Sequence, residues 1–185
     1  MNVLLAAARG IDRLNEMVGR LVYWLILVMV LISAGNAVSR YGFNLSSNAW
    51  LEIQWYLFSA VFLLGAGYAL LKGAHVRIDL VANRFSHRVN AWIDIFGIVL
   101  FVLPMCVAFL VFGWDMFITS WTGNELSTDA GGLVRWPVKL LVPIGFALLL
   151  LQAMSELIKR IGYLRGRFDW SPAGTPGSTS AADAT

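Results

Sequence analysis

The stretch IFGIVLFVLPMCVAFLVFGW, residues 95–114, decides the fold because none of its twenty residues carries a charge. An α-helix rises about 1.5 Å per residue, so about 20 apolar residues cross the roughly 30 Å hydrocarbon core of a bilayer. Residues 21–38 and 53–71 have the same character, and residues 138–158 are apolar except for Lys139 and Glu156 near the two ends. We therefore expect four transmembrane helices, over residues 18–39, 50–72, 91–117 and 137–160.

The composition indicates the same class of protein. Of the 185 residues, 58% are hydrophobic and 14% are charged, whereas a soluble domain is typically about 45–50% apolar and about 25% charged. The predicted fold class is all-α: a polytopic membrane protein whose four-helix membrane domain covers residues 1–168. Residues 169–185 are rich in Pro, Gly, Ser, Thr and Ala without periodicity, which predicts a disordered cytoplasmic tail.

The positions of the basic residues predict the orientation. Eleven of the 14 Lys and Arg residues precede the first helix, join the second to the third, or follow the fourth. Only Arg40, Arg135 and Lys139 lie on the other side. Cytoplasmic loops carry the excess of positive charge, so both termini are expected in the cytoplasm. Short basic clusters between apolar stretches indicate orientation in a membrane, not nucleic-acid binding.

The connection between the second and third helices has a helical pattern of its own. Six apolar residues fall on one face at 100° per residue: Ile78, Val81, Ala82, Phe85, Val89 and Trp92. Asp79 is placed to cap the start of this helix. We expect an interfacial amphipathic helix over residues 79–89, lying flat at the headgroups on membrane lipid. The alternative is a short soluble turn.

The sequence predicts no catalytic, cofactor-binding or metal site, and the chain is not expected to be an enzyme. Ionisable groups inside a membrane are costly and usually functional, yet Asp94, Asp115 and Glu156 all lie near predicted interfaces, where long side chains such as that of Glu156 reach the headgroups. His75 and His87 suggest a haem ligand pair, but both lie in the cytoplasmic connection.

Two features of the second helix are candidates for contacts with a partner. Glu52 lies beside Trp55 and Tyr56 at the outer end, where it is either an interfacial carboxylate in an aromatic belt or a docking group. Gly65 and Ala69, four residues apart, form a small-residue face that allows close helix approach, within the chain or to a partner. In the third helix, Pro104 predicts a kink.

Two segments resemble a known family. The sequence WLEIQWYLFSAVFLLGAGYALLKGAHVRIDL, residues 50–80, resembles the small membrane subunit of tripartite ATP-independent periplasmic (TRAP) transporters, the DctQ-like family. The sequence GGLVRWPVKLLVPIGFALLLLQAMSELIKRI, residues 131–161, resembles its last helix. The likeness covers about residues 15–165. Many relatives carry two adjacent acidic residues where this chain has Glu52 followed by Ile53.

The resemblance implies a scaffold role in a bacterial inner membrane. Such a subunit buttresses a large, DctM-like elevator subunit that imports organic acids or related solutes with sodium, and a periplasmic solute-binding protein delivers the solute. Glu52, Trp55 and Tyr56 are then expected near the large subunit, and Arg77 and Asp79 at the turn into the flat helix. Arg135 and Trp136 are expected at the periplasmic surface.

Two other functions remain open from the residues alone. A membrane anchor for a redox complex would hold haem or quinone and show a Soret band. A self-associating small transporter would move solute without any other chain.

Overall fold

The computed structural model describes residues 2–45, 47–73 and 86–166. Its elements are helical, and the part of the chain described contains no strand beyond one isolated bridge. The helices are α1 (Asn2–Gly42), α2 (Asn48–Leu71), α4 (His87–Gly97), the π-helical η1 (Ile98–Val102), α5 (Leu103–Thr122) and α6 (Trp136–Leu164). Since α4, η1 and α5 are continuous, four helices are long and apolar enough to span a membrane, which confirms the predicted fold class.

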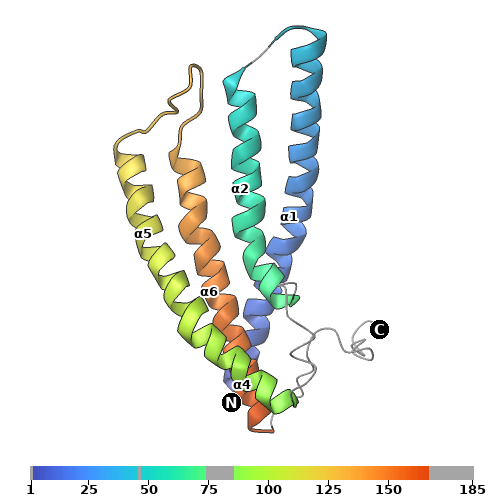
Figure 1. Ribbon diagram of the computed structural model, residues 1–185, viewed down its shortest axis with the longest axis vertical. Helices are drawn as coiled ribbons and strands as arrows, with labels where there is room; N and C mark the ends of the chain where they lie inside the picture. Colours follow the sequence, from blue (N-terminus) through green and yellow to red (C-terminus); the bar gives the residue numbers. More distant parts are fainter. Residues whose placement is uncertain (1, 46, 74–85, 167–185) are drawn as a thin grey trace.

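The helices form an open array (Figure 1). In this view α5, α6, α2 and α1 follow one another across the molecule. The helix α6 packs against α1, α2 and α5, whereas α5 has its main helix contact with α6. Consequently 44% of the most apolar 18-residue window of α6 is buried, against 11% in each of the other three spans. The helix α6 is therefore the core of the fold.

A glycine sets the distance between α6 and α2. A Cβ atom added at Gly145 would lie 2.8 Å from both the Cβ and the carbonyl oxygen of Leu63. Such a distance is shorter than van der Waals contact, so only glycine lets the two backbones approach this closely. Small residues have this role at many membrane helix interfaces, because close approach maximises packing.

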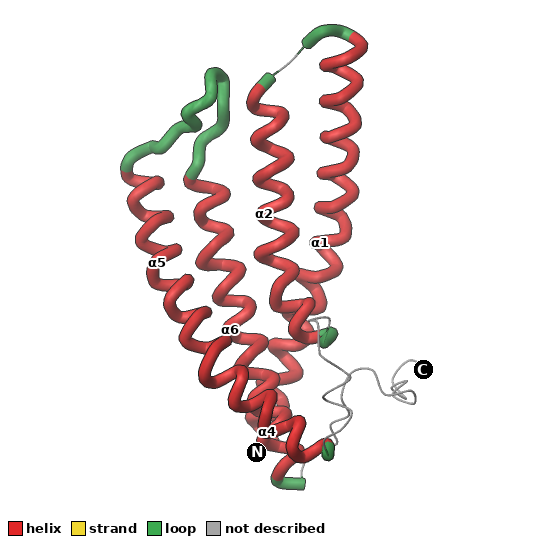
Figure 2. The backbone as a smooth tube through the Cα atoms, viewed as in Figure 1, coloured by secondary structure: helices red, strands yellow, loops and turns green. Residues whose placement is uncertain are grey.

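The two ends of the array differ in character (Figure 2). The first residues of α1, the last residues of α6 and the start of α4 lie together at one end, which we call the terminal end. The α1–α2 connection and the α5–α6 connection lie at the opposite end, which we call the hairpin end. Whichever side of a membrane each end faces, the described parts of the chain enter and leave on the same side.

The helix bounds differ most from the prediction in α1. This helix begins at Asn2 instead of near residue 18, and its 41 residues correspond to a length of about 60 Å. That is about twice the hydrocarbon thickness of a bilayer. The charged residues before Leu21 ended the hydropathy signal but not the helix, because α6 packs against α1.

The third crossing runs from His87 to Thr122 without a break. Pro104 is the second residue of α5, which directly follows the π-helical segment η1. Proline lacks the N–H that an α-helix would use, and the wider π turn is the local irregularity that accompanies it. Residues 87–89 of the expected interfacial helix belong to α4. Residues 79–85 of that helix and the predicted tail lie outside the described residues.

Candidate partner-binding hairpin and buried polar cluster

The segment between α5 and α6, residues 123–135, folds back on itself as a short hairpin. Leu126 and Val134 form an antiparallel bridge, and the Ser127 N–H donates to the Leu133 carbonyl over 3.0 Å. These hydrogen bonds satisfy backbone N–H and C=O groups that have no helical partner, so the loop has a defined shape.

One face of α2 binds this hairpin. Asn48, Glu52 and Tyr56 are spaced four residues apart, so their side chains lie along a single face of the helix. The Asn48 amide donates to the Ala130 carbonyl, and the Tyr56 hydroxyl donates to the Val134 carbonyl, each over 3.0 Å. The α2 helix therefore fixes the hairpin through its backbone.

Glu52 is the centre of this contact. One carboxylate oxygen accepts the Ser127 hydroxyl, and the other accepts the Leu133 N–H over 2.5 Å. A Cβ atom at Gly132 would lie 2.7 Å from the carboxylate, and Gly131 has a φ of +74°, a conformation that favours glycine. Both glycines are needed for the hairpin to close over Glu52. The carboxylate expected as a docking group is thus used within the chain, with Glu52 only 7% exposed.

The hairpin is also tied to α6. Lys139 forms an ion pair with Glu125 and holds the pKa of that carboxyl below its ordinary value. Trp136, in the first turn of α6, makes an edge-to-face contact with Trp121 of α5, with ring centroids 4.5 Å apart. Arg135 donates to the Thr128 hydroxyl over 3.4 Å. Arg135 and Trp136 therefore stabilise the base of the hairpin and are half-buried.

The remaining predicted contact residues have different positions. Trp55 is 70% exposed, whereas Gly65 and Ala69 are half-buried. A Cβ atom at Gly65 would make only an ordinary 3.8 Å contact with α1, so among the described residues Gly65 is not a point of close helix approach. Arg77 and Asp79 lie outside the described residues.

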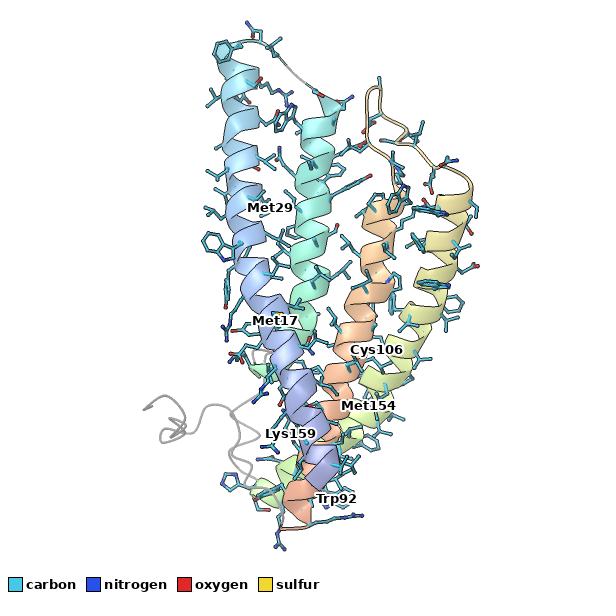
Figure 3. All side chains as sticks on the ribbon, turned by 180° about the vertical axis from the view of Figure 1, so that it is seen from behind. Met17, Met29, Trp92, Cys106, Met154 and Lys159 are labelled. Atoms are coloured by element: carbon cyan, nitrogen blue, oxygen red, sulfur yellow. The ribbon has the colours of Figure 1, made fainter. Side chains whose placement is uncertain are left out.

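A second polar region lies at the terminal end, between α1, α4 and α6. We call it the terminal cluster, and its members are Asp12, Asn15, Asp94, Gln152, Ser155, Glu156, Lys159 and Arg160. Figure 3 labels Lys159 on α6 where α1 crosses it. Most of the cluster is inaccessible to solvent: Gln152 is 0% exposed, Arg160 4% and Glu156 6%.

Ion pairs connect the three helices in this cluster. Lys159 of α6 lies 3.2 Å from Asp12 of α1 and 2.5 Å from Glu156. Arg160 lies 3.0 Å from Asp94 of α4 and also pairs with Glu156. Each basic side chain thus joins α6 to another helix while neutralising a charge on α6 itself. Glu156, which the sequence placed near a membrane interface, is held between the helices by the cations beside it.

A chain of amides continues the cluster toward α2. Gln152 donates to Asp12 over 2.9 Å, and Asn15 donates to the Gln152 carbonyl over 3.0 Å. Because a carboxylate only accepts, Asp12 sets the orientation of both amides. The Asn15 Oδ1 then faces Gly67 of α2, where an added Cβ would overlap it and lie 3.3 Å from the Leu148 carbonyl. Gly67, not Gly65, is therefore the close-approach glycine of α2 toward α1 and α6.

Sequence reasoning missed this cluster, although its signal was present. The last turns of α6 carry polar residues at helical spacings in an otherwise apolar segment: Gln152, Ser155, Glu156, Lys159 and Arg160. Such a stripe indicates a helix face that meets other polar groups. Its partners on α1 lie about 140 residues away in sequence, and the expectation that the first helix began near residue 18 left them out.

The described residues contain no group of three or more His, Cys, Asp or Glu side chains arranged to hold a metal ion. His87 is exposed at the start of α4, and His75 lies outside the described residues. In the described residues, the polar side chains of the two regions bond to one another or to loop backbone.

Comparison with known proteins identifies the family. The family model described as "Tripartite ATP-independent periplasmic transporters, DctQ component" matches residues 29–162. This chain belongs to the DctQ family. It is 30% identical over 114 residues to the "C4-dicarboxylate TRAP transporter small permease protein DctQ" of Pseudomonas aeruginosa. The aligned part is 60% of this chain and 52% of that protein, so the chain spans about half the length of the curated relative. No solved structure matches the chain.

The DctQ family is a component of TRAP transporters, which is not an enzyme class. The matched residues include the hairpin, the face of α2 that binds it, and the α6 half of the terminal cluster. They do not include Asp12 or Asn15, which lie on the part of α1 before residue 29.

Proposed function

We propose that this chain is a non-catalytic scaffold subunit of a sodium-coupled TRAP importer for organic acids or related solutes in a bacterial inner membrane. In this role the chain packs beside a large elevator-type membrane subunit and widens the part of the complex that stays fixed. A periplasmic solute-binding protein delivers the solute. The chain itself binds neither solute nor sodium.

The observation that carries the proposal is where the polar groups are found. In the described residues, the buried charges pair with one another at the terminal end, and the buried carboxylate at the hairpin end bonds to the loop. Between the two ends, α6 meets α5 and α2 through the close contacts of Gly113 and Gly145, and Phe146 stacks on Phe109. A protein of this kind is suited to holding helices in fixed positions.

The exposed apolar surface supports the partnership. On α2, the aromatic side chains of Trp55, Phe58 and Phe62 recur at spacings of three and four residues and are 60–70% exposed. They form one face, next to the face of α2 that holds the hairpin. We propose this face for contact with the large subunit at Trp55, with the half-buried Gly65 and Ala69 farther along α2.

The proposed orientation places the terminal end in the cytoplasm, since the loops at that end carry most of the basic residues. The hairpin then faces the periplasm. Its exposed tip, residues 128–131, and the adjacent Arg135 are the surface proposed for the solute-binding protein. In this proposal Glu52 and Tyr56 act indirectly, since they hold the hairpin in the shape that the receptor meets. Arg77 and Asp79 are proposed to fix the turn after α2.

The proposal is tested by purification and reconstitution. The chain is expressed with the large subunit and the solute-binding protein, extracted in mild detergent, and incorporated into vesicles with a sodium gradient. We expect the two membrane chains to co-purify, and uptake to require both of them together with the receptor. If the chain emerges alone, or if vesicles containing only this chain accumulate an organic acid, the proposal is wrong.

A further inference from the structure

The outer face of α1 carries an unbroken row of apolar and glycine residues. From Val3 the row continues through Ala7, Gly10, Leu14 and Met17, and it keeps the alternating spacing of four and three residues to Val38. All eleven positions are exposed, including Met17 at 68%, and none carries a polar side chain. We call this set the α1 row.

The spacing of the α1 row is that of a helix seam. A strict repeat of seven residues over five repeats is the pattern on which two helices supercoil left-handedly, with side chains interlocking. Lipid requires only that exposed positions be apolar and imposes no such spacing.

The length of α1 indicates that protein, and not lipid alone, covers the α1 row. The helix is about 60 Å long, so the hydrocarbon region covers only about half of it. Residues 2–20 carry charged side chains, among them Arg9, Arg13 and Glu16, yet the α1 row remains apolar through this part. Charged side chains are costly in the hydrocarbon region of a bilayer, so the lipid acyl chains do not extend over this part of α1. The apolar residues beyond that point require another protein to cover them.

Two glycines in the α1 row add an independent observation. Gly10 and Gly35 have no atom of the described structure within 4 Å of the position that a Cβ would occupy. Glycine inside a helix costs about 1 kcal/mol relative to alanine. No contact among the described residues compensates for this cost at Gly10 or Gly35. A backbone approaching from another chain would use this space, as glycines do at membrane helix interfaces.

The charges beside the row indicate which kind of chain approaches. Arg13 and Arg20 flank the row one repeat apart and are exposed, and Arg20 also forms a 3.8 Å ion pair with the partly exposed Glu16 on the same helix. A second copy of this chain in the same orientation would place Val18 and Leu25 opposite these arginines, following the flanking positions of a parallel pair. Neither residue accepts an ion pair. The pattern therefore favours a different chain that carries acidic residues at this level.

We propose that the α1 row binds one helix of a partner membrane chain, apolar across the bilayer and acidic where it meets Arg13 and Arg20. The inference rests on the proposed function, in which the large subunit supplies this helix. The α1 row is then the seam along which the two subunits are held, and it extends past the membrane into the cytoplasm.

Site-specific photo-crosslinking tests the seam. A photoreactive amino acid is introduced singly at Met17, Trp24 or Leu31 on the row, and at Tyr23 or Val30 as off-row controls of similar exposure. The membranes contain the large subunit and the receptor. We expect a crosslink to one larger chain from the three row positions and a several-fold weaker one from the controls.

Each other outcome counts against the inference. Equal yields on and off the row, crosslinks only to lipid, or crosslinks between two copies of this chain would all overturn it. Co-purification of the unmodified chain with the large subunit is measured in parallel. If the two chains still co-purify but the crosslinks form at positions outside the α1 row, the assignment of the α1 row as the seam is wrong and the proposed function stands. If co-purification fails, the proposed function is itself wrong.

Charge reversal tests the acidic partner. With the probe at Met17, the double variant Arg13→Glu/Arg20→Glu is expected to lower the crosslink yield roughly five-fold, whereas the exposed Arg9→Glu serves as control. The measurement is made on the complex in phosphatidylcholine vesicles with and without phosphatidylglycerol. An equal loss of crosslink yield in both kinds of vesicle supports an interaction with acidic side chains of a partner. A fall only with the anionic lipid, or no fall, overturns this part.

Discussion

The hairpin end and the terminal end are both held by polar side chains, but the bonds are of different kinds. At the hairpin end, α2 side chains such as Glu52 and Tyr56 bond mainly to loop backbone. At the terminal end, Arg160 and Lys159 pair with carboxylates on other helices.

The difference follows from what each end must satisfy. A loop has backbone N–H and C=O groups without helical partners, so a helix beside it can supply bonds to them. Helices satisfy their own backbones, so side chains that meet between them must pair with one another. The first arrangement fixes the shape of a loop, and the second fixes the position and register of whole helices. Breaking the second should therefore cost more.

The largest effect is expected from Arg160→Met. This change leaves the buried Glu156 and the partly buried Asp94 beside a neutral side chain, and removing one partner of a buried pair typically costs about 3–5 kcal/mol. Unfolding by denaturant in detergent micelles, followed by circular dichroism, measures the loss. The control is Arg165→Met, at an exposed position. Equal stability of the two variants would show that the terminal cluster does not hold the helices.

A smaller loss is expected from Gly67→Ala. The added methyl group overlaps Asn15 and approaches the Leu148 carbonyl, and overpacking of this kind typically costs about 1–3 kcal/mol. The matched control is Gly65→Ala on the same helix, where the methyl group makes an ordinary contact with Val22. The same unfolding assay compares them. If Gly65→Ala were the more damaging change, the assignment of Gly67 as the close-approach glycine would be wrong.

The sequence predicted the helices well because their signal is local. Twenty apolar residues require a membrane wherever they lie in the chain, and the four spans followed from that fact. The start of α1 was mispredicted because its stability there depends on α6, through pairs such as Asp12 with Lys159. Hydropathy contains no information about such a pair.

The site was less predictable for the same reason. Glu52 was singled out as an interfacial or docking carboxylate, but its partner Leu133 is 81 residues away and contributes only a backbone N–H, which leaves no trace in the side-chain pattern. Similarly, Gly65 and Gly67 look equivalent in sequence. Only the rotation of α2 toward Asn15 distinguishes them.

At the hairpin end, Glu52→Ala is expected to loosen the loop without unfolding the helices. It removes the acceptor of the Leu133 N–H and of the Ser127 hydroxyl. Hydrogen exchange at the Ser127 amide should accelerate by about ten-fold, the effect of losing a charge-assisted hydrogen bond. Amides in α6 should keep their rates. The control, Trp55→Ala, removes an exposed side chain next to this face. Unchanged exchange at Ser127 would mean that Glu52 does not hold the hairpin.

The smallest effect is expected from the ion pair that joins the hairpin to α6. Lys139 lowers the pKa of Glu125 below its ordinary value of 4.5, so folding favours the ionised carboxylate. The contribution of this pair is therefore fully present above pH 4.5 and is lost as the pH falls through the lowered pKa.

The measurement is hydrogen exchange of the Arg135 N–H, which donates to the Glu125 carbonyl. The rate in the parent chain is compared with that in Glu125→Gln at each pH, so that intrinsic exchange rates cancel. The parent should be modestly better protected at pH 6, and the two should converge at low pH. Since both side chains are partly exposed, the difference at pH 6 should also shrink in high salt. A difference that persists at low pH would mean that the glutamine disturbs the hairpin for a reason other than charge.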